Sequence, residues 1–342
     1  MQNICNLNLI ELEAQLKKLG EPSFRAKQVF SWIYKKGVID FSQMSDLSEA
    51  LRTRLQKEFS ILDLELAKKA ESADGTQKLL FELGGKDYVE AVIIPADARV
   101  TGCISSQVGC RFSCKFCASG LNSFKRNLTC GEILQEVLYL KNHSIDKKLT
   151  HIVFMGTGEP LDNYTQVLKA IRIINSDYAF HIGARRITIS TCGLIPEIKK
   201  LMSEDLQFEL SISLHCADDK TRSRLMPINN KYPVSELIKT CKEYFNKTKR
   251  QVTFEYLLIK NLNSDLQSAL NLGRILQGSD FKVNLIPANA VQERGIEPPG
   301  KLEILFFRDQ LIKAGIHVTL RKARGQDIDA ACGQLRLRYE NK

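Results

Sequence analysis

The chain has 342 residues, of which 44% are hydrophobic, and its formal net charge is +10. This length suits one large domain with a smaller companion, and the apolar content allows a sizeable core. No apolar run is long enough to cross a membrane, and the first residues lack the charged-then-apolar pattern of a signal peptide. We therefore exclude a membrane-spanning protein and expect a soluble, cytoplasmic one with reduced cysteines.

The positive charge is concentrated after residue 100. Residues 1–100 carry 14 Lys and Arg against 15 Asp and Glu, whereas the remainder carries 35 against 24. A basic second part suits a polyanionic substrate such as RNA. Ordinary surface charge that keeps a protein soluble gives the same balance, so charge alone leaves both interpretations open.

Residues 1–60 have the hydrophobic spacing of helices. One apolar stripe consists of Ala26, Val29, Phe30, Ile33 and Tyr34, and a second of Leu47, Leu51, Leu55 and Phe59. We expect a small helical accessory domain here. Over residues 61–99 the spacing changes to that of strands, at 79–83 and 88–95, so this part is predicted to be a strand-rich connector.

Residues 100–342 alternate between strand and helix patterns. Strands are expected at 151–155, 186–190, 208–214, 252–259, 282–287 and 317–320. One helix begins after Thr129, which forms a capping-box pair with Glu132, and the last ends at Gly315. Repeated βα units predict an α/β fold, a partial (βα)6 barrel that stays open, with helices on its outside. In such folds the site lies at the carboxyl ends of the strands.

Three cysteines form a C-x3-C-x2-C run: Cys110, Cys114 and Cys117. Thiolates at this spacing can hold one iron–sulfur cluster from a single loop. Three ligands leave one iron without a protein ligand, and that iron can bind substrate directly. A structural zinc site, with Cys103 as the fourth ligand, also fits the spacing.

Polar residues follow several of the predicted strands. Gly158 and Glu159 come after strand 151–155, where glycines let a ligand approach the backbone and a carboxylate can accept from an ammonium group. Further residues at strand ends are Ser190, Ser213, Leu214, His215 and Asn289. Each alone is typical of a turn or cap, but their shared placement favours a ligand site. No G-x-G-x-x-G opens a helix after a strand, which counts against a Rossmann fold.

Besides Cys103, six cysteines lie outside the run. Cys332 stands in a basic, glycine-containing C-terminal segment whose arginines could contact phosphates. The isolated cysteines Cys5, Cys130, Cys192, Cys216 and Cys241 are interpreted as small buried core residues.

The chain contains, in this order, GCISSQVGC, CKFCASG, RNLT, MGTGEPL, RRITIST, SISLH, LMPIN, NLIP and RGQDIDAACGQL. Together these segments resemble the dual-specificity adenine methyltransferases of the RlmN type, in the radical S-adenosylmethionine (SAM) superfamily, over residues 20–338. Phe116 matches the aromatic residue usual before the last cysteine of the run. The sister Cfr type shares the cysteines, but Pro160 and the basic residues before Cys332 are closer to RlmN. Thr157, where the family usually has Met, and the missing Gly before Phe124 are departures.

The resemblance implies a reaction and its residues. Cys110, Cys114 and Cys117 hold a [4Fe–4S] cluster, two SAM molecules are used per turnover, and Gly158, Glu159, Ser190, Ser213, Leu214, His215 and Asn289 contact SAM. Cys332 takes a methyl group from the first SAM, and the radical made from the second removes a hydrogen from that methyl. The resulting carbon radical attacks carbon 2 of adenosine, at position 2503 of 23S rRNA or 37 of tRNAs. Cys103 releases the product by forming a disulfide with Cys332, and Glu90 is the proton acceptor.

The resemblance also implies partners: 23S rRNA, tRNA and an electron donor such as flavodoxin or ferredoxin. A monomer is expected, because no heptad or apolar surface stripe is evident. Two alternatives remain at this point. One is a Cfr-type enzyme that methylates carbon 8 with the same residues, and the other is a non-catalytic, zinc-stabilised RNA-binding protein.

Overall fold

The computed structural model describes residues 1–120, 123–144, 148–289, 296–321 and 324–328. Its centre is a ten-stranded sheet with the order β14-β13-β12-β11-β10-β9-β6-β5-β4-β3. The strands are β3 (Glu65–Glu71), β4 (Gln77–Leu83), β5 (Asp87–Ala96), β6 (Arg99–Ile104), β9 (His151–Phe154), β10 (Ile187–Thr191), β11 (Glu209–Ser213), β12 (Val252–Leu258), β13 (Lys282–Pro287) and β14 (His317–Leu320). Neighbours from β6 to β14 are parallel, and those from β3 to β6 are antiparallel. The end strands β14 and β3 do not pair with each other, so the barrel is open.

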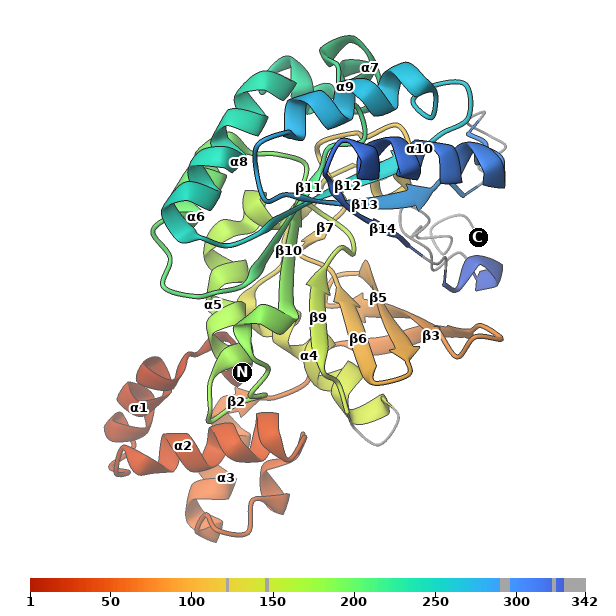
Figure 1. Ribbon diagram of the computed structural model, residues 1–342. Coiled ribbons are helices and arrows are strands. Elements are labelled where there is room, and N and C mark those ends of the chain that lie inside the picture. Colours follow the sequence, from red (N-terminus) through yellow and green to blue (C-terminus); the bar gives the residue numbers. More distant parts are fainter. Residues whose placement is uncertain (121–122, 145–147, 290–295, 322–323, 329–342) are drawn as a thin grey trace.

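Helices cover the outer face of the parallel part (Figure 1). They are α4 (Cys130–His143), α5 (Tyr164–Asn175), α6 (Ile195–Leu201), α7 (Asp219–Leu225), α8 (Val234–Thr248), α9 (Leu266–Leu276) and α10 (Lys301–Lys313). The expected capping box is confirmed, because Thr129 caps α4 and Glu132 bonds back to the Thr129 amide. Gly315, with φ +78°, follows α10 and confirms the predicted helix end.

All six strands expected in the second part are present, and β6 joins them at the start of the parallel sheet. Sequence patterns passed over β6 because Gly102 interrupts it, and glycine weakens a strand pattern. The structure explains this glycine. A Cβ atom at residue 102 would lie 2.9 Å from Leu140 of α4, which packs directly on the strand.

The helices predicted for the N-terminal part are α1 (Leu9–Lys18), α2 (Phe24–Phe30) and α3 (Glu49–Glu58), with a π-helical turn η2 (Ser31–Lys35) after α2. Both apolar stripes are buried. The short strands β1 (Gln2–Asn3) and β2 (Phe59–Ser60) pair in parallel and bring the two ends of this unit together. Contacts to the barrel helices include Glu11 with Lys169 at 2.6 Å and Asn6 with the Gly131 amide at 2.8 Å.

Strands β3, β4 and β5, from the segment interpreted as a connector, extend the barrel sheet as an antiparallel meander. A separate two-stranded ribbon pairs β7 (Gln107–Val108) with β8 (Arg126–Asn127) and encloses the cysteine run. The strand-rich segment is therefore continuous with the barrel through the β5–β6 pairing.

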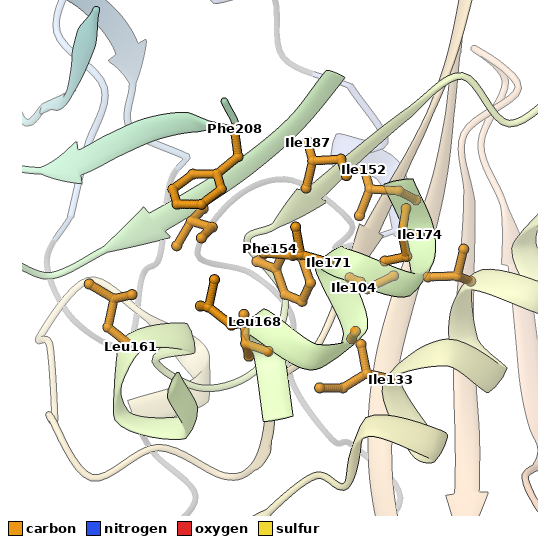
Figure 2. Packing of buried hydrophobic residues seen from close by; sticks show 14 of the residues in the cluster. Ile104, Ile133, Ile152, Phe154, Leu161, Leu168, Ile171, Ile174, Ile187 and Phe208 are labelled. Atoms are coloured by element: carbon orange, nitrogen blue, oxygen red, sulfur yellow. The ribbon is translucent and has the colours of Figure 1, made fainter. Parts of the chain in front are cut away.

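Side-chain alternation divides each barrel strand between core and cavity. Ile152 and Phe154 of β9 are buried and pack with Leu168 and Ile171 of α5 (Figure 2). Each such side chain contributes about 1.5–3 kcal/mol through burial. Val153, between them in sequence, points to the opposite, concave face. In the described part of the chain, no helix is both long and apolar enough to cross a bilayer.

Candidate active site

The concave face of the sheet holds a cavity of about 810 Å³. It is lined mainly by inward-facing side chains of β5, β6 and β9 to β14. Cys103, Met155 and Asn289 lie toward the carboxyl ends of the strands, and Arg99 and Lys282 toward the amino ends. The cavity therefore extends along the whole length of the strands.

The cysteine run lies on a loop between β7 and β8. The Lys115 amide donates to the Leu225 carbonyl of α7 at 2.8 Å, and the Cys117 amide donates to the Cys114 carbonyl at 3.1 Å. Cys110, Cys114 and Cys117 are half-buried, and no disulfide joins the cysteines that the structure describes. Burial raises the pKa of Cys110 to about 12, and a nearby Cys117 adds to this. The predicted thiols therefore lie near one another in a sheltered loop.

The surroundings of the thiols bear on the kind of group that they could hold. Within the described ranges, no three His, Cys, Asp or Glu side chains are arranged to hold a single metal ion. A cubic cluster binds each thiolate at a different iron, so its ligands surround the group and do not converge on one point. Burial raises the pKa of Cys114, whereas the Arg222 charge favours its thiolate, and such a cation suits an anionic cluster.

The His215 side chain packs against the cysteine loop. Its ring lies edge-to-face with Phe116, with 4.5 Å between the ring centroids. The Leu257 amide donates to His215 Nδ1 at 3.0 Å, and burial together with the Arg222 charge lowers the pKa of His215 to about 3. The imidazole is therefore neutral at physiological pH, with Nδ1 as the acceptor.

The glycine turn after β9 packs against the end of β6. The Gly156 amide donates to the Ile104 carbonyl at 3.0 Å, and the Thr157 carbonyl accepts from the Ser106 amide at 2.9 Å. A Cβ atom at Gly156 would lie 2.6 Å from the Ile104 carbonyl oxygen, and one at Gly158 would lie 2.5 Å from Gln107 Cβ. These glycines thus allow the close approach of the protein's own chain.

Glu159 is buried beside this turn. Its Oε1 accepts from the Leu161 amide at 3.0 Å and its Oε2 from the Cys192 amide at 2.8 Å. Burial raises the pKa of Glu159, although these hydrogen bonds oppose the shift. Each carboxylate oxygen has two lone pairs, so the group can still accept from an ammonium ligand.

The remaining strand-end residues occupy the same rim. Ser190 lies in β10 opposite Ser211, and Ser213 ends β11. Both are half-buried, whereas Leu214 is fully buried. Asn289 follows β13 and lines the cavity. The parallel register therefore brings these residues to the edge of the sheet that also carries the cysteine loop.

Glu90 and Cys103 lie on neighbouring antiparallel strands. Cys103 pairs with Val92, and Glu90 is two residues before Val92, so both side chains face the same side of the sheet. Glu90 is only 2% exposed, and its Oε1 lies 2.8 Å from the ammonium of Lys78. A lone carboxylate on a strand is usually exposed, whereas this one forms a buried ion pair.

Cys332 lies outside the described residues, but the segment 324–328 that leads to it is described. Ile328 packs against the small cluster of Val92 and Cys103. The Ser72 hydroxyl donates to Asp327, and the Gly325 amide donates to Asp74 at 3.2 Å. Residues 324–328, which lead to Cys332, are thus held near Cys103.

Comparison with known proteins connects this geometry to a family. Residues 2–61 match the ribosomal RNA large subunit methyltransferase N-terminal domain, and residues 104–272 match the radical SAM superfamily. The chain is 47% identical over 340 residues to the probable dual-specificity RNA methyltransferase RlmN of Clostridium acetobutylicum, covering 99% of this chain and 98% of that protein. The chain belongs to the RlmN family.

Another RlmN protein, from Staphylococcus aureus, is 44% identical over 337 residues and covers 98% of this chain and 93% of its own length. The crystal structure of a radical SAM methyltransferase from Sphaerobacter thermophilus superimposes with a TM-score of 0.94 at 39% identity, covering 98% of this chain and 99% of that one. These findings confirm the resemblance to RlmN and the α/β radical SAM fold. The protein is an enzyme, so the non-catalytic alternative is overturned. Membership of the superfamily implies a [4Fe–4S] cluster and SAM.

Arg222 is a residue that the sequence interpretation missed in this RlmN protein. It is 0% exposed and donates to the Leu214 carbonyl at 3.1 Å, the Cys192 carbonyl at 2.8 Å and Asn229 Oδ1 at 2.9 Å. A buried charge requires several such partners. Arg222 therefore fixes two strand ends beneath the cysteine loop. The local sequence TRSR is typical of an exposed helix and contains no signal of this role.

The sequence interpretation also missed Lys78, the ion-pair partner of Glu90 described above. It missed Glu136 as well. Glu136 of α4 is fully buried, and its Oε2 accepts from the Ser105 amide at 3.0 Å. The Ser105 hydroxyl in turn donates to the Glu90 carbonyl at 2.7 Å and accepts from the Thr157 amide at 2.9 Å. This network ties α4 to the glycine turn. Burial raises the pKa of Glu136 well above its usual range, and the hydrogen bond from the Ser105 amide partly opposes this shift.

Proposed function

We propose that this enzyme methylates carbon 2 of adenosine in 23S rRNA and in tRNA through a methylated cysteine. The relatives carry the name dual-specificity RNA methyltransferase, which supports the substrate class. The observation that carries the proposal is the position of Ile328, which packs against Cys103 only four residues before Cys332. Four residues span at most about 14 Å, so the two cysteines are within reach of one substrate base.

The residues of the cysteine loop and of the strand ends have separate roles. Cys110, Cys114 and Cys117 would hold the cluster. When bound, the cluster supplies the electron that cleaves SAM to a 5′-deoxyadenosyl radical. SAM is held by Gly158, Glu159, Ser190, Ser213, Leu214, His215 and Asn289. Glu159 accepts from the amino group of SAM, for which it keeps spare lone pairs, and neutral His215 with Phe116 closes the apolar side.

Three residues act on the RNA base. The Cys332 sulfur accepts a methyl group from a first SAM, and after losing a hydrogen atom this carbon bonds to carbon 2 of adenine. The unpaired electron that this addition leaves on the adenine ring would return to the bound cluster. Glu90, in its ion pair with Lys78, takes the carbon-2 proton. The Cys103 thiolate then bonds to the Cys332 sulfur as the carbon–sulfur bond breaks. The released CH2 carbon keeps the electron pair of that bond and takes up a proton from solvent, which completes the methyl group and frees the methylated RNA. Cys103 is buried in the wall of the cavity, where it is sheltered from other thiols.

The proposal also assigns roles to the domains and to an electron donor. Residues 1–60 form an RNA-binding accessory domain, residues 61–99 connect it to the barrel, and residues 100–342 form the catalytic core. Lys36 of the accessory domain lies over the Trp32 ring at 3.1 Å, a cation and an aromatic surface of the kind that RNA contacts use. A flavodoxin or ferredoxin supplies the electron, and the protein acts as a monomer.

Product identity tests the proposal. The protein is reconstituted with iron and sulfide without oxygen and given a reductant, methyl-labelled SAM, and transcripts of an rRNA fragment and a tRNA. The digested nucleosides are compared with 2-methyladenosine and 8-methyladenosine. Labelled 2-methyladenosine is the expected result. Label in 8-methyladenosine assigns the Cfr type, and no labelled nucleoside from protein with an intact cluster overturns the substrate.

Two variants test the cysteine roles. Cys332→Ser cannot accept the methyl group, so both protein label and RNA label are lost. Cys103→Ser still accepts the methyl group but cannot release the adduct, so a covalent protein–RNA species accumulates. Equal product from parent and Cys103→Ser would contradict the role given to Cys103. Cluster absorbance of each variant is the control for folding.

A further inference from the structure

The amino end of the cavity carries a group of cations that the proposed reaction does not use. Arg99 begins β6, Lys282 begins β13, and Arg185 lies just before β10. The parallel register brings these positions to the same edge of the sheet, and all three side chains line the cavity that contains Cys103. We refer to Arg99, Arg185 and Lys282 as the floor cluster.

The charge of the floor cluster is not neutralised by ion pairs. Arg185 donates to the neutral Gln207 amide oxygen at 3.1 Å, and in the described residues Arg99 and Lys282 have no carboxylate within 4.0 Å. His151 lies beside them, and burial with the charges of Arg99 and Arg186 lowers its pKa. The pKa shift disfavours a charged imidazole, so His151 contributes no carboxylate-like partner that would neutralise Arg99.

Two carboxylates that line the cavity face the cluster: Glu209, and Glu255, whose pKa is raised by burial and lowered in part by Arg321 and Lys282. Burial raises the pKa of Glu209, which Arg185 and Lys282 partly oppose. Two acidic groups against three cations leave a net positive floor. Arg172 on the outer helix α5 differs, because it contacts both Glu204 at 2.6 Å and Asp205 at 2.7 Å.

The length of the strands relates the floor cluster to the reacting groups. Arg99 is four residues before Cys103 on β6, a separation of about 13 Å along an extended strand. A few nucleotides of single-stranded RNA span this distance. The wall between the two ends carries hydroxyl and amide groups that suit ribose and base edges, from Thr101, Thr188, Ser211, Thr253 and Asn284.

We propose that the floor cluster binds backbone phosphates of the substrate RNA next to the adenosine that is modified. The RNA strand then runs along the concave face, with the reacting base near Cys103 and its neighbouring phosphates at Arg99, Arg185 and Lys282. Guanidinium groups bind phosphate through two parallel hydrogen bonds, and such contacts position a strand without reading its sequence. The inference rests on the proposed RNA substrate and adds the site that holds its backbone.

Salt-dependent binding tests the inference. Arg99→Gln, Arg185→Gln and Lys282→Gln are compared with Arg274→Gln on α9 and Lys239→Gln on α8, which remove the same charge from outer helices. The dissociation constant of a tRNA transcript is measured from low to moderate salt. Each floor variant should weaken binding several-fold at low salt and reduce the slope of log K against log salt by about 0.7 to 0.9, whereas the outer variants keep the parent slope.

Steady-state kinetics distinguish a loss of RNA binding from damage to the catalytic site. Floor variants should raise KM for RNA and leave both kcat at saturating RNA and SAM cleavage without RNA unchanged. Floor variants with the parent slope and the parent KM would overturn the inference. If the parent makes no methylated nucleoside but the floor variants still lose slope, the proposed reaction fails and the phosphate site stands. If the parent methylates RNA and the floor variants match it, only the phosphate site fails.

Discussion

The Asp327 carboxylate accepts a hydrogen bond from the Ser72 hydroxyl, with 2.6 Å between the two oxygens. This contact joins the hairpin turn between β3 and β4 to the segment that leads to Cys332. The Ala73 amide also donates to Asp327, at 3.3 Å, and the Gly325 amide donates to Asp74 at 3.2 Å. Burial opposes ionisation of Asp74, but hydrogen bonds from Thr76 and Gly325 lower its pKa to about 2. The ionised Asp74 carboxylate in this turn therefore holds the C-terminal segment at neutral pH.

Replacing Asp327 should slow the first methyl transfer. In Asp327→Asn the carboxylate charge is lost, so the segment before Cys332 is held less tightly near the site. The rate at which label from methyl-SAM enters the protein should fall several-fold, and Ser72→Ala should give a similar fall. Asp309→Asn, which removes an exposed carboxylate on α10, is the control. Parent rates in both Asp327→Asn and Ser72→Ala would show that the turn does not position Cys332.

Removing one partner of the buried Lys78–Glu90 ion pair should destabilise the folded protein strongly, because the other charge is then left buried without it. Lys78→Met takes the nearest cation from a carboxylate that is 3% exposed, at an expected cost of about 3–5 kcal/mol. Glu90→Gln combined with Lys78→Met should cost less than the sum of the two single variants. Urea unfolding of the four proteins measures the coupling. Lys200→Met, which breaks an exposed pair with Glu197, should cost under about 1 kcal/mol.

His215 should make the folded protein sensitive to acid. Its pKa is lowered to about 3 by burial and by Arg222, so the unfolded chain takes up a proton below about pH 6.5 while the folded chain does not. Its contribution is fully present above that pH and is lost as pH falls toward 3. Between these values, the stability of the parent should fall relative to His215→Gln by up to about 1.4 kcal/mol per pH unit. Urea titrations between pH 7 and pH 4 give the difference, and parallel curves would contradict the assignment.

Gly158 should not tolerate a side chain. Its φ is +102°, and a Cβ atom would lie 2.5 Å from Gln107 Cβ. Backbone strain and overpacking together predict a loss of about 2–4 kcal/mol for Gly158→Ala. Gly183→Ala is the matched control, because no atom lies within 4 Å of its Cβ position. Thermal unfolding of the two variants should differ clearly, and equal melting temperatures would show that the turn can relax.

Local features of this protein were predictable because they depend on neighbours in the chain. The buried stripe from Ala26 to Tyr34, the capping box of Thr129 with Glu132 and the end of α10 before Gly315 each follow from helix geometry alone. The alternation of strands and helices predicted the parallel sheet. Parallel strands then bring their ends to one edge, so the grouping of Glu159, Ser213 and Asn289 near the cysteine loop was also predictable.

Only the tertiary structure determined which charged groups are buried and what they meet. Ser72 and Asp327 are 255 residues apart in the chain, and nothing near either residue indicates the other. Glu90 and Arg222 have local sequences typical of exposed positions, yet both are buried with compensating partners. The floor cluster likewise forms because the register of three separate strands brings Arg99, Arg185 and Lys282 together. Spacing along the chain determines helices, caps and ligand runs, whereas burial and charge pairing depend on which surfaces the folded sheet encloses.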